Sequence, residues 1–331
     1  DTPPEFQSLI ALQQPLKKLH SGSLQSVSGS VSVVVCTRNR PEQLVRCLRS
    51  LQNLSQPPKQ IIVVDNAPSD EATRQLVTQM PGVQYVLESR PGLSVARNTG
   101  IRHSIGDIIA FTDDDVEVHS DWIARLQQSF ENPKVMAVTG LVLPGELETE
   151  AQVAFEKGFG GFNRGYRVLT FDSQFFEEMR YRGVPVWRIG AGANMALRRK
   201  AFELVGYFDE RLGAGASGCS EDSEFWYRIL AEGWLCRYEP TAVVYHYHRS
   251  DLDKLKQQMY QYMRGHVAAV LVQFARYQHW GNLRYLSVSL PKYYTRRFLW
   301  ALLKDFKSLN KMLFAEVLGC VSGVKYYLQN K

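Results

Sequence analysis

One stretch, residues 108–117, constrains the fold and chemistry of this chain more than any other. It begins with the apolar run Ile-Ile-Ala-Phe and ends in three consecutive acids, Asp113, Asp114 and Asp115, before Val116 and Glu117. Unpaired charges are costly to bury, so the acids are expected where the strand leaves the core. In an open α/β sheet, ligands bind at that edge. Asp113 and Asp115 alternate with Asp114, so in an extended chain they point the same way and offer two oxygen ligands for Mg²⁺ or Mn²⁺. A solvated acidic loop is the alternative that this stretch alone leaves open.

Apolar runs that could form buried strands recur along the chain. They lack the polar alternation of a half-exposed strand, and segments with helical spacing or helix-start signals separate them. The runs are 31–36, 61–64, 83–86, 108–113, 135–140 and 241–245, and helices are expected from Pro41, over 70–79, from the segment 92–100 with Ser94 as its cap, and over 121–130. This pattern predicts an α/β fold, in which helices cover both faces of a Rossmann-like, mostly parallel central sheet.

Composition divides the chain into three parts. Residues 1–30 are rich in Gln, Ser and Pro and are expected to be an N-terminal extension or linker. Residues 31–250 carry the alternating pattern and are predicted to form one domain with two halves, 31–115 and 116–250. Within it, 145–185 has weaker periodicity and is expected to be an insertion that covers a cleft. Residues 251–331 are predicted to be a helical, basic and amphipathic C-terminal region.

The positive charge is concentrated in that last part. Residues 251–331 hold 13 of the 39 Lys and Arg but 4 of the 33 Asp and Glu, a balance of +9, whereas the rest of the chain has a balance of −3. Aromatic residues interleave with these cations, which is typical of helices that lie in a membrane interface. No run of about 18 uncharged apolar residues is present, so peripheral membrane association is expected rather than a span. Packing of these helices on the domain is the open alternative. No nucleic-acid motif accompanies the cations, so no nucleic-acid partner is expected.

Two further sites hold residue types that carry chemistry. Glu221 and Asp222 open a predicted helix after a glycine-rich loop, and His246 ends the last predicted strand. Each alone has an ordinary structural explanation, because acids favour helix starts and a single histidine is often a core or surface residue. The helix dipole also favours the ionised form of Asp222, which suits a general base. The combination with the acids of 113–115 is more specific than any one of the three.

Taken together, the motifs resemble those of family 2 glycosyltransferases with the GT-A fold. The resemblance covers 31–250, extends only weakly into 251–331, and does not include 1–30. The matching stretches are 31–41, 63–66, 92–100, 111–115, 190–197, 205–210 and 220–224 with Arg228 and Gly233. The resemblance implies that 31–115 is the nucleotide-binding half of the domain and 116–250 the acceptor half.

The resemblance also implies roles for individual residues. Those placed at the nucleotide are Thr37, Arg38, Arg40, Asp65, Arg97, Asp113 and Asp114. The metal, Mn²⁺ or Mg²⁺, is assigned to Asp113, Asp115 and His246, with His248 as the substitute for His246. Asp222 takes the position of the catalytic base, and Glu221 belongs to the same acidic motif. Residues of the donor and acceptor pocket are Trp187, Gly190, Gly192 and Asn194.

The function implied is inverting transfer of a sugar from a nucleotide-diphosphate sugar, expected to be a UDP-sugar, to a hydroxyl of a glycan, a lipid-linked glycan or a small acceptor. The alternative is a catalytically inactive sugar-nucleotide-binding protein of the same fold. A phosphohydrolase with an aspartyl nucleophile would need its acids after the first strand, where Cys36, Thr37 and Arg38 stand instead. The five cysteines are odd in number and widely spaced, which favours free thiols and a cytoplasmic location, with peripheral attachment to the membrane as an extension.

Overall fold

The computed structural model describes residues 29–304 and 306–331, except the side chains of 159 and 302–311. The predicted N-terminal linker therefore lies outside the described residues, apart from Gly29 and Ser30. Ser30 is fixed by the carboxylate of Asp107, which accepts from the Ser30 backbone N–H at 2.8 Å and from its hydroxyl at 2.9 Å. This contact holds the start of the first strand beside the start of β4 (Ile108–Asp113).

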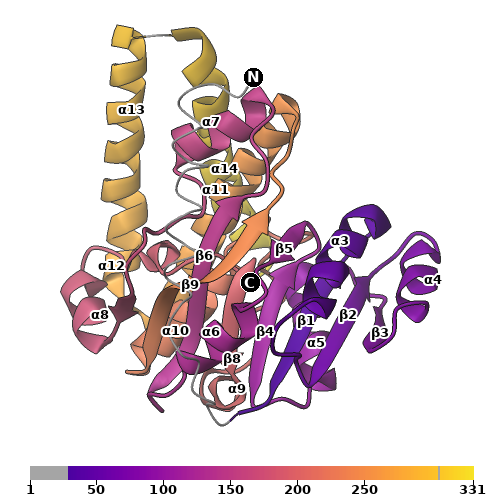
Figure 1. The fold of residues 1–331 in the computed structure, drawn as a ribbon. Coiled ribbons are helices and arrows are strands. Elements are labelled where there is room, and N and C mark those ends of the chain that lie inside the picture. The colour runs from indigo at the N-terminus through magenta and orange to yellow at the C-terminus, as the bar shows by residue number, and fades with distance from the viewer. Residues whose placement is uncertain (1–28, 305) are drawn as a thin grey trace.

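A nine-stranded sheet forms the centre of the described chain (Figure 1). The strand order is β3-β2-β1-β4-β8-β6-β9-β5, and β7 also pairs with β9. Besides β4, the strands are β1 (Val31–Thr37), β2 (Gln60–Asn66), β3 (Val83–Glu88), β5 (Val116–Val118), β6 (Val135–Pro144), β7 (Leu169–Phe171), β8 (Asn194–Arg198) and β9 (Leu235–His246). The first four strands are mutually parallel, whereas β8 runs antiparallel to both β4 and β6.

Helices cover both faces of this sheet, as predicted. The helices within the α/β part are α3 (Pro41–Gln52), α4 (Ala72–Thr78), α5 (Leu93–His103), α6 (Trp122–Gln128), α7 (Glu150–Phe159), α8 (Ser173–Arg180), α9 (Arg199–Val205) and α10 (Glu221–Ala231). Val33 of β1 packs in a core cluster with Leu44 of α3 and Trp122 of α6. Its neighbour Val34 joins a second cluster with Phe225 of α10. Uninterrupted apolar strands are therefore needed, since each buries both of its faces, and the predicted α/β class is confirmed.

A set of helices follows the last strand. They are α11 (Leu252–Tyr277), α12 (Trp280–Arg284), the π-helical turn η2 (Tyr285–Ser289), α13 (Leu290–Lys304) and α14 (Phe306–Gln329). Helices α13 and α14 rise above the sheet in Figure 1. Helix α14 packs along α11.

One local prediction needs correction. Ser94 does not cap α5, because the helix begins at Leu93 after Gly92, and the Ser94 hydroxyl donates to the carbonyl of Leu212 at 2.7 Å. The backbone φ of Gly92 is 130°, a value that favours glycine and marks this helix start. Residues 145–185, which were predicted to be an insertion, contain α7, β7 and α8. The periodicity is weak there because these elements are short and only partly buried.

Candidate active site

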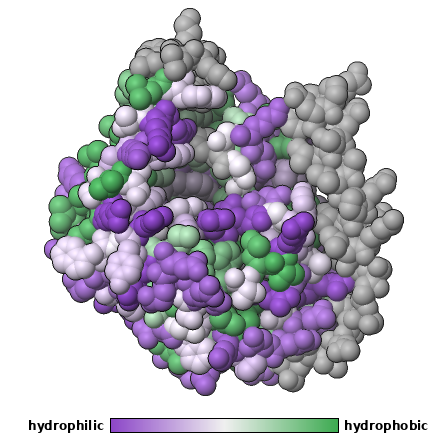
Figure 2. Space-filling model, turned by 90° about the vertical axis from the view of Figure 1, so that its left-hand side faces the viewer, coloured by the Kyte–Doolittle hydropathy of each residue, from purple (hydrophilic) through white to green (hydrophobic). Residues whose placement is uncertain are grey.

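A cavity of about 940 Å³ lies where the first parallel strands end. Figure 2 shows one face of the molecule hollowed between mostly hydrophilic side chains. The sequence-predicted site residues that line the cavity are Thr37, Arg38, Arg40, Arg97, Asp113, Asp114, Asp115, Trp187, Gly190, Gly192, Glu221, Asp222 and His246. Residues up to 209 positions apart in the chain thus meet in one space, because the sheet topology brings the ends of β1, β4 and β9 together.

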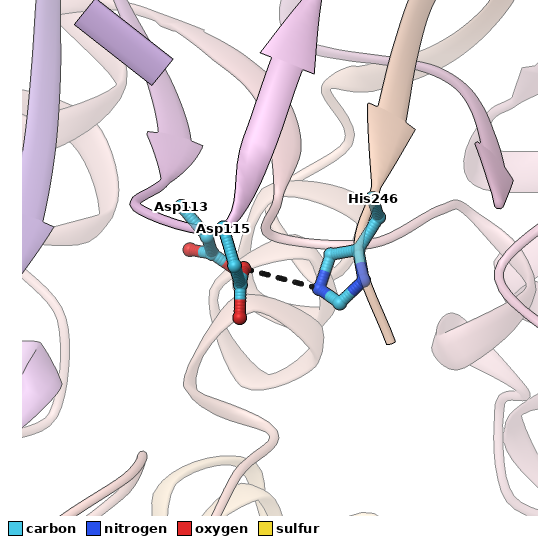
Figure 3. A group of neighbouring side chains, drawn as sticks. All are labelled: Asp113, Asp115 and His246. Atoms are coloured by element: carbon cyan, nitrogen blue, oxygen red, sulfur yellow. Dashed lines mark ion pairs between the residues drawn. The ribbon is translucent and has the colours of Figure 1, made fainter. Parts of the chain in front are cut away.

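Asp113, Asp115 and His246 form the group best suited to a metal ion (Figure 3). One ligand atom from each lies within 4.8 Å of the others, and His246 Nε2 is 3.3 Å from Asp115 Oδ1. Burial lowers the pKa of His246 below its usual value, so the imidazole is neutral at pH 7 and can present a lone pair. Two carboxylates and a neutral imidazole are ligands that fit Mn²⁺ and are compatible with Mg²⁺.

Two successive hydrogen bonds, from His246 to His248 and from His248 to Glu156, fix the orientation of the His246 imidazole. The Nε2 atom of His248 is 2.7 Å from Glu156 Oε1, and the Nδ1 atoms of His246 and His248 are 3.0 Å apart. An ionised carboxylate only accepts, so His248 donates from Nε2 and, when neutral, accepts at Nδ1. His246 must then donate from Nδ1, which leaves its Nε2 lone pair facing Asp115. Partners of this kind set the tautomer of a metal-binding histidine.

Removing the Glu156 carboxylate, the last acceptor in this series of hydrogen bonds, is expected to weaken metal binding. The variant Glu156→Leu should bind Mn²⁺ about tenfold more weakly than the wild type, because His248 can then adopt either tautomer. Glu156→Gln should recover most of the affinity, since its amide oxygen can still accept. Titration of the protein with Mn²⁺, followed by electron paramagnetic resonance, measures the free ion directly. Glu203→Leu, at an exposed position of α9, is the control, and an unchanged affinity in Glu156→Leu would contradict this role.

Asp114 does not belong to the metal-binding group and is buried. Its carboxylate accepts from the Thr37 hydroxyl at 2.7 Å and from Arg40 at 3.2 Å. Burial raises the pKa of Asp114 to about 7, and the negative charge of Asp115 adds to the rise. Arg40 also pairs with Asp115 at 3.2 Å. Thr37, Arg40 and Asp114 therefore form a brace that connects the end of β1 to the acidic turn after β4.

Arg97 connects the acids of β4 to the acidic motif of α10. It is buried, and its guanidinium lies 2.6 Å from Glu221 Oε1 and 3.6 Å from Asp113 Oδ1. Burial by itself would lower the pKa of Arg97, but the carboxylates of Glu221 and Asp113 outweigh it and raise the pKa. Burial raises the pKa of Glu221 to about 7, against the opposing effect of Arg97. The second carboxylate oxygen of Glu221 is buried and has no hydrogen-bond partner among the described residues.

Asp222 is held by backbone groups rather than by a cation. Its Oδ2 accepts from the N–H of Gly192 at 2.8 Å, and its Oδ1 accepts from the N–H of Ser223 at 2.6 Å. Each oxygen keeps a lone pair for another donor. A Cβ at position 192 would lie 2.8 Å from the Arg97 guanidinium and 3.1 Å from Asp222, so a side chain there would displace Arg97. The carboxylate is thus fixed in the cavity wall, close to Arg97.

Two predicted site residues do not line the cavity. Asn194 is fully buried, and its amide is saturated by the Trp122 indole at 2.8 Å and by the carbonyls of Leu141 and Ala242. Its assignment to the donor and acceptor pocket is therefore wrong, and Asn194 instead connects β8 to β6 and β9. Asp65 is also fully buried, one residue behind Asn66, which does line the cavity. Its Oδ2 accepts from Tyr85 at 3.0 Å, whereas Oδ1 has no partner within the described chain.

The cavity also contains residues that the sequence did not single out. Arg164 and Arg249 add positive charge to its wall, and Phe155 and Phe162 pack against the two histidines. The far wall is built by α11 to α14, with Tyr285, Tyr293, Tyr294 and Arg297 among its residues. Of these residues, only Arg249 could have been identified from the sequence, because it lies three residues after His246, which was predicted to bind the metal. The others come from the insertion and the C-terminal helices, where no motif marks them.

The sheet, the acidic turn after β4 and the separate acidic motif at α10 are those of a glycosyltransferase with the GT-A fold. The mannosyltransferase PcManGT from Pyrobaculum calidifontis, solved in complex with GDP-Man and Mn²⁺, has a similar fold. Its TM-score is 0.57 at 17% identity, over 96% of this chain and 95% of that one. Residues 32–206 match the sequence family described as Glycosyl transferase family 2. The chain belongs to this family.

Two relatives show how far the similarity extends. The succinoglycan biosynthesis protein ExoM of Rhizobium meliloti (strain 1021) is 32% identical over 228 residues, which are 65% of this chain and 66% of that protein. The pre-mycofactocin glycosyltransferase of Mycobacterium tuberculosis (strain ATCC 25618 / H37Rv) is 29% identical over 224 residues, which are 67% of this chain and 43% of that protein. The chain thus spans slightly less than two thirds of one relative and under half of the other.

Proposed function

We propose that the protein transfers a sugar from a nucleotide-diphosphate sugar, a UDP-sugar in the first instance, to an acceptor hydroxyl with inversion at the anomeric carbon. One observation carries this proposal: the metal-binding group and the Asp222 carboxylate line the same cavity, and Asp222 is not a member of that group. An inverting displacement needs a cationic site at the leaving diphosphate and a base on the opposite face of the sugar.

Asp113, Asp115 and His246 would hold Mn²⁺ or Mg²⁺, which would neutralise the charge that develops on the diphosphate. Arg38, which lines the cavity and is exposed, supplies further positive charge for the phosphates. Arg40 and Thr37 fix the acidic turn through Asp114, so that Asp115 is positioned before the donor enters. These residues orient the donor and need little rearrangement, which is how preorganised sites lower a barrier.

Asp222 is proposed as the base that accepts the proton of the attacking hydroxyl. Its two backbone hydrogen bonds aim the carboxylate and leave a lone pair on each oxygen. Glu221, paired with Arg97, is proposed to hold Arg97 beside the donor rather than to take the proton itself. Gly190, Gly192 and Trp187 shape the space between the two carboxylate sites.

The nucleoside is proposed to lie near the end of β2. The unpartnered Oδ1 of Asp65 can accept an N–H from a nucleobase after a small movement of Asn66. Asp65→Asn would offer an amide instead, so we expect nucleotide affinity to fall about tenfold, the loss of one charge-assisted hydrogen bond. Calorimetric titration with UDP and with GDP measures this effect and compares the two bases. Equal affinity in the wild type and Asp65→Asn would place the nucleobase elsewhere.

The acceptor is proposed to be a glycan or a lipid-linked glycan, as in polysaccharide biosynthesis, and the similarity to a succinoglycan biosynthesis protein supports this. A cytoplasmic location with peripheral membrane association through 251–331 completes the proposal. Within the described residues, no helix is both long and apolar enough to cross a membrane.

A donor screen tests the proposed function. Nucleotide-sugars are incubated with Mn²⁺ and candidate acceptors, and released nucleoside diphosphate is measured, with the anomeric configuration of the product read by nuclear magnetic resonance. One donor should be turned over, with inversion. Binding of nucleotides without turnover of any donor would favour the inactive binding protein instead.

A further inference from the structure

Helix α14 carries an apolar stripe that no part of the described chain covers. Phe314, Val317, Leu318, Val321, Val324 and Leu328 recur at intervals of three or four residues, so they share one side of the helix. Their exposed fractions range from 38% to 66%. The end of α13 adds three more exposed apolar side chains, Phe298, Leu299 and Trp300, at 41% to 56%. An apolar surface of this length is unusual in a protein that functions alone in water.

The opposite side of α14 is fixed, so the stripe cannot be buried by turning the helix. Gly319 and Gly323 allow α14 to lie close to α11. A Cβ on Gly319 would lie 2.3 Å from the carbonyl oxygen of Tyr260, and a Cβ on Gly323 would lie 2.5 Å from that of Arg264. The Tyr260 hydroxyl also donates to Ser322 at 2.7 Å, and the Tyr326 hydroxyl reaches the carbonyl of Arg211 at 2.9 Å. These contacts hold the stripe on the outer surface.

The charges around the stripe are almost all of one sign. After Asp253, the chain contains 13 Lys and Arg but only two acids, Asp305 and Glu316. Glu316 is buried and paired with Arg297 at 2.5 Å, so it contributes little negative charge to the surface. Lys292, Arg296 and Lys325 are exposed on the same two helices. An apolar stripe flanked by cations complements an anionic lipid surface. A second copy would bring the same cations together, which disfavours self-association through this face.

We propose that the outer face of α14, with the adjoining end of α13, docks in the plane of an anionic lipid bilayer. The proposed membrane contact is thus one helix face and not the whole basic region 251–331. The apolar side of α11, with Leu255 and Met259, is buried in the protein and cannot take part. The same α13 supplies Tyr293 and Arg297 to the cavity wall. Docking therefore brings the membrane next to the acceptor side of the cavity, a consequence that rests on the proposed function.

The test is flotation of the purified full chain with phosphatidylcholine vesicles, with and without phosphatidylglycerol, at low and high salt. We expect binding that requires the anionic lipid and weakens with salt. The double variant Leu318→Ser with Val321→Ser should bind at least about tenfold more weakly, because two apolar side chains are withdrawn from the interface. These positions are 60% and 66% exposed, so folding should be unaffected. Leu87→Ser with Ile105→Ser, at 57% and 60% exposure in β3 and just after α5, is the matched control.

Three results would overturn the proposal. They are no binding of the wild type to anionic vesicles, equal binding by the α14 double variant and the wild type, and a wild-type dimer in sedimentation that the double variant loses. Release of nucleoside diphosphate from the donor, measured without vesicles, tests the proposed enzyme activity independently of membrane docking. The double variant should retain the wild-type rate there, since neither residue lines the cavity.

Discussion

Replacement of Asp222 by Asn is expected to lower kcat by at least about 10²-fold, while nucleotide binding in the presence of Mn²⁺ should stay near the wild-type level. Asn has nearly the same shape but cannot take a proton from the acceptor hydroxyl. Gly192 and Ser223 donate to the two oxygens of Asp222, so Asn can satisfy one of them and retain much of the local geometry. Steady-state kinetics at saturating donor and calorimetric titration with the nucleotide measure the two quantities separately.

A displaced loop is the alternative explanation for a slow Asp222→Asn variant, and donor binding distinguishes it. Gly192 lies close to Arg97, so a shift of this loop would also weaken the nucleotide side of the cavity. Turnover at the wild-type rate in Asp222→Asn would remove Asp222 from the role and make Glu221→Gln the next variant to measure.

The strands were predictable where they are buried on both faces. The apolar run of β1 needs helices above and below, and this requirement leads directly to the α/β class. Strand β9 was predicted only over 241–245, although it spans Leu235–His246. Pro240 interrupts the pattern, because proline is rarely found within a central strand. The structure accommodates it with a register shift: the partners of β9 change from Gly140 opposite Glu239 to Leu141 opposite Val243.

The site was predictable where residues close in sequence determine geometry. The alternation of Asp113 and Asp115 around Asp114 is a local property of an extended chain, and the structure shows the resulting division between the metal-binding group and the brace to Thr37. Asn194 was assigned wrongly because a motif does not indicate which side of a strand faces the cavity. The link from Glu156 to His248 spans 92 positions, so only the folded chain reveals it.

The second large effect concerns the metal-binding group. Mn²⁺ together with UDP should raise the melting temperature of the wild type by about 5 °C at a hundredfold excess over Kd, because a ligand that binds only the native state stabilises it by mass action. Asp115→Asn should abolish this rise and reduce transfer at least about 10³-fold, since a neutral amide is a poor ligand for a hard cation. Differential scanning fluorimetry with and without Mn²⁺ measures the shift, and Asp253→Asn, at an exposed acid of α11, is the control.

The melting temperature without metal shows whether Asp115→Asn fails to bind or fails to fold. Burial and the charge of Asp115 together raise the pKa of Asp114 to about 7, so these acids oppose one another in the folded protein. Removing the charge of Asp115 relieves that opposition, although it also weakens the contacts with Arg40 and His246. The metal-free variant should therefore melt close to the wild type. A preserved Mn²⁺-dependent shift in a variant that melts normally would show that Asp115 is not a metal ligand, and the acids after β4 would then be an ordinary solvated turn.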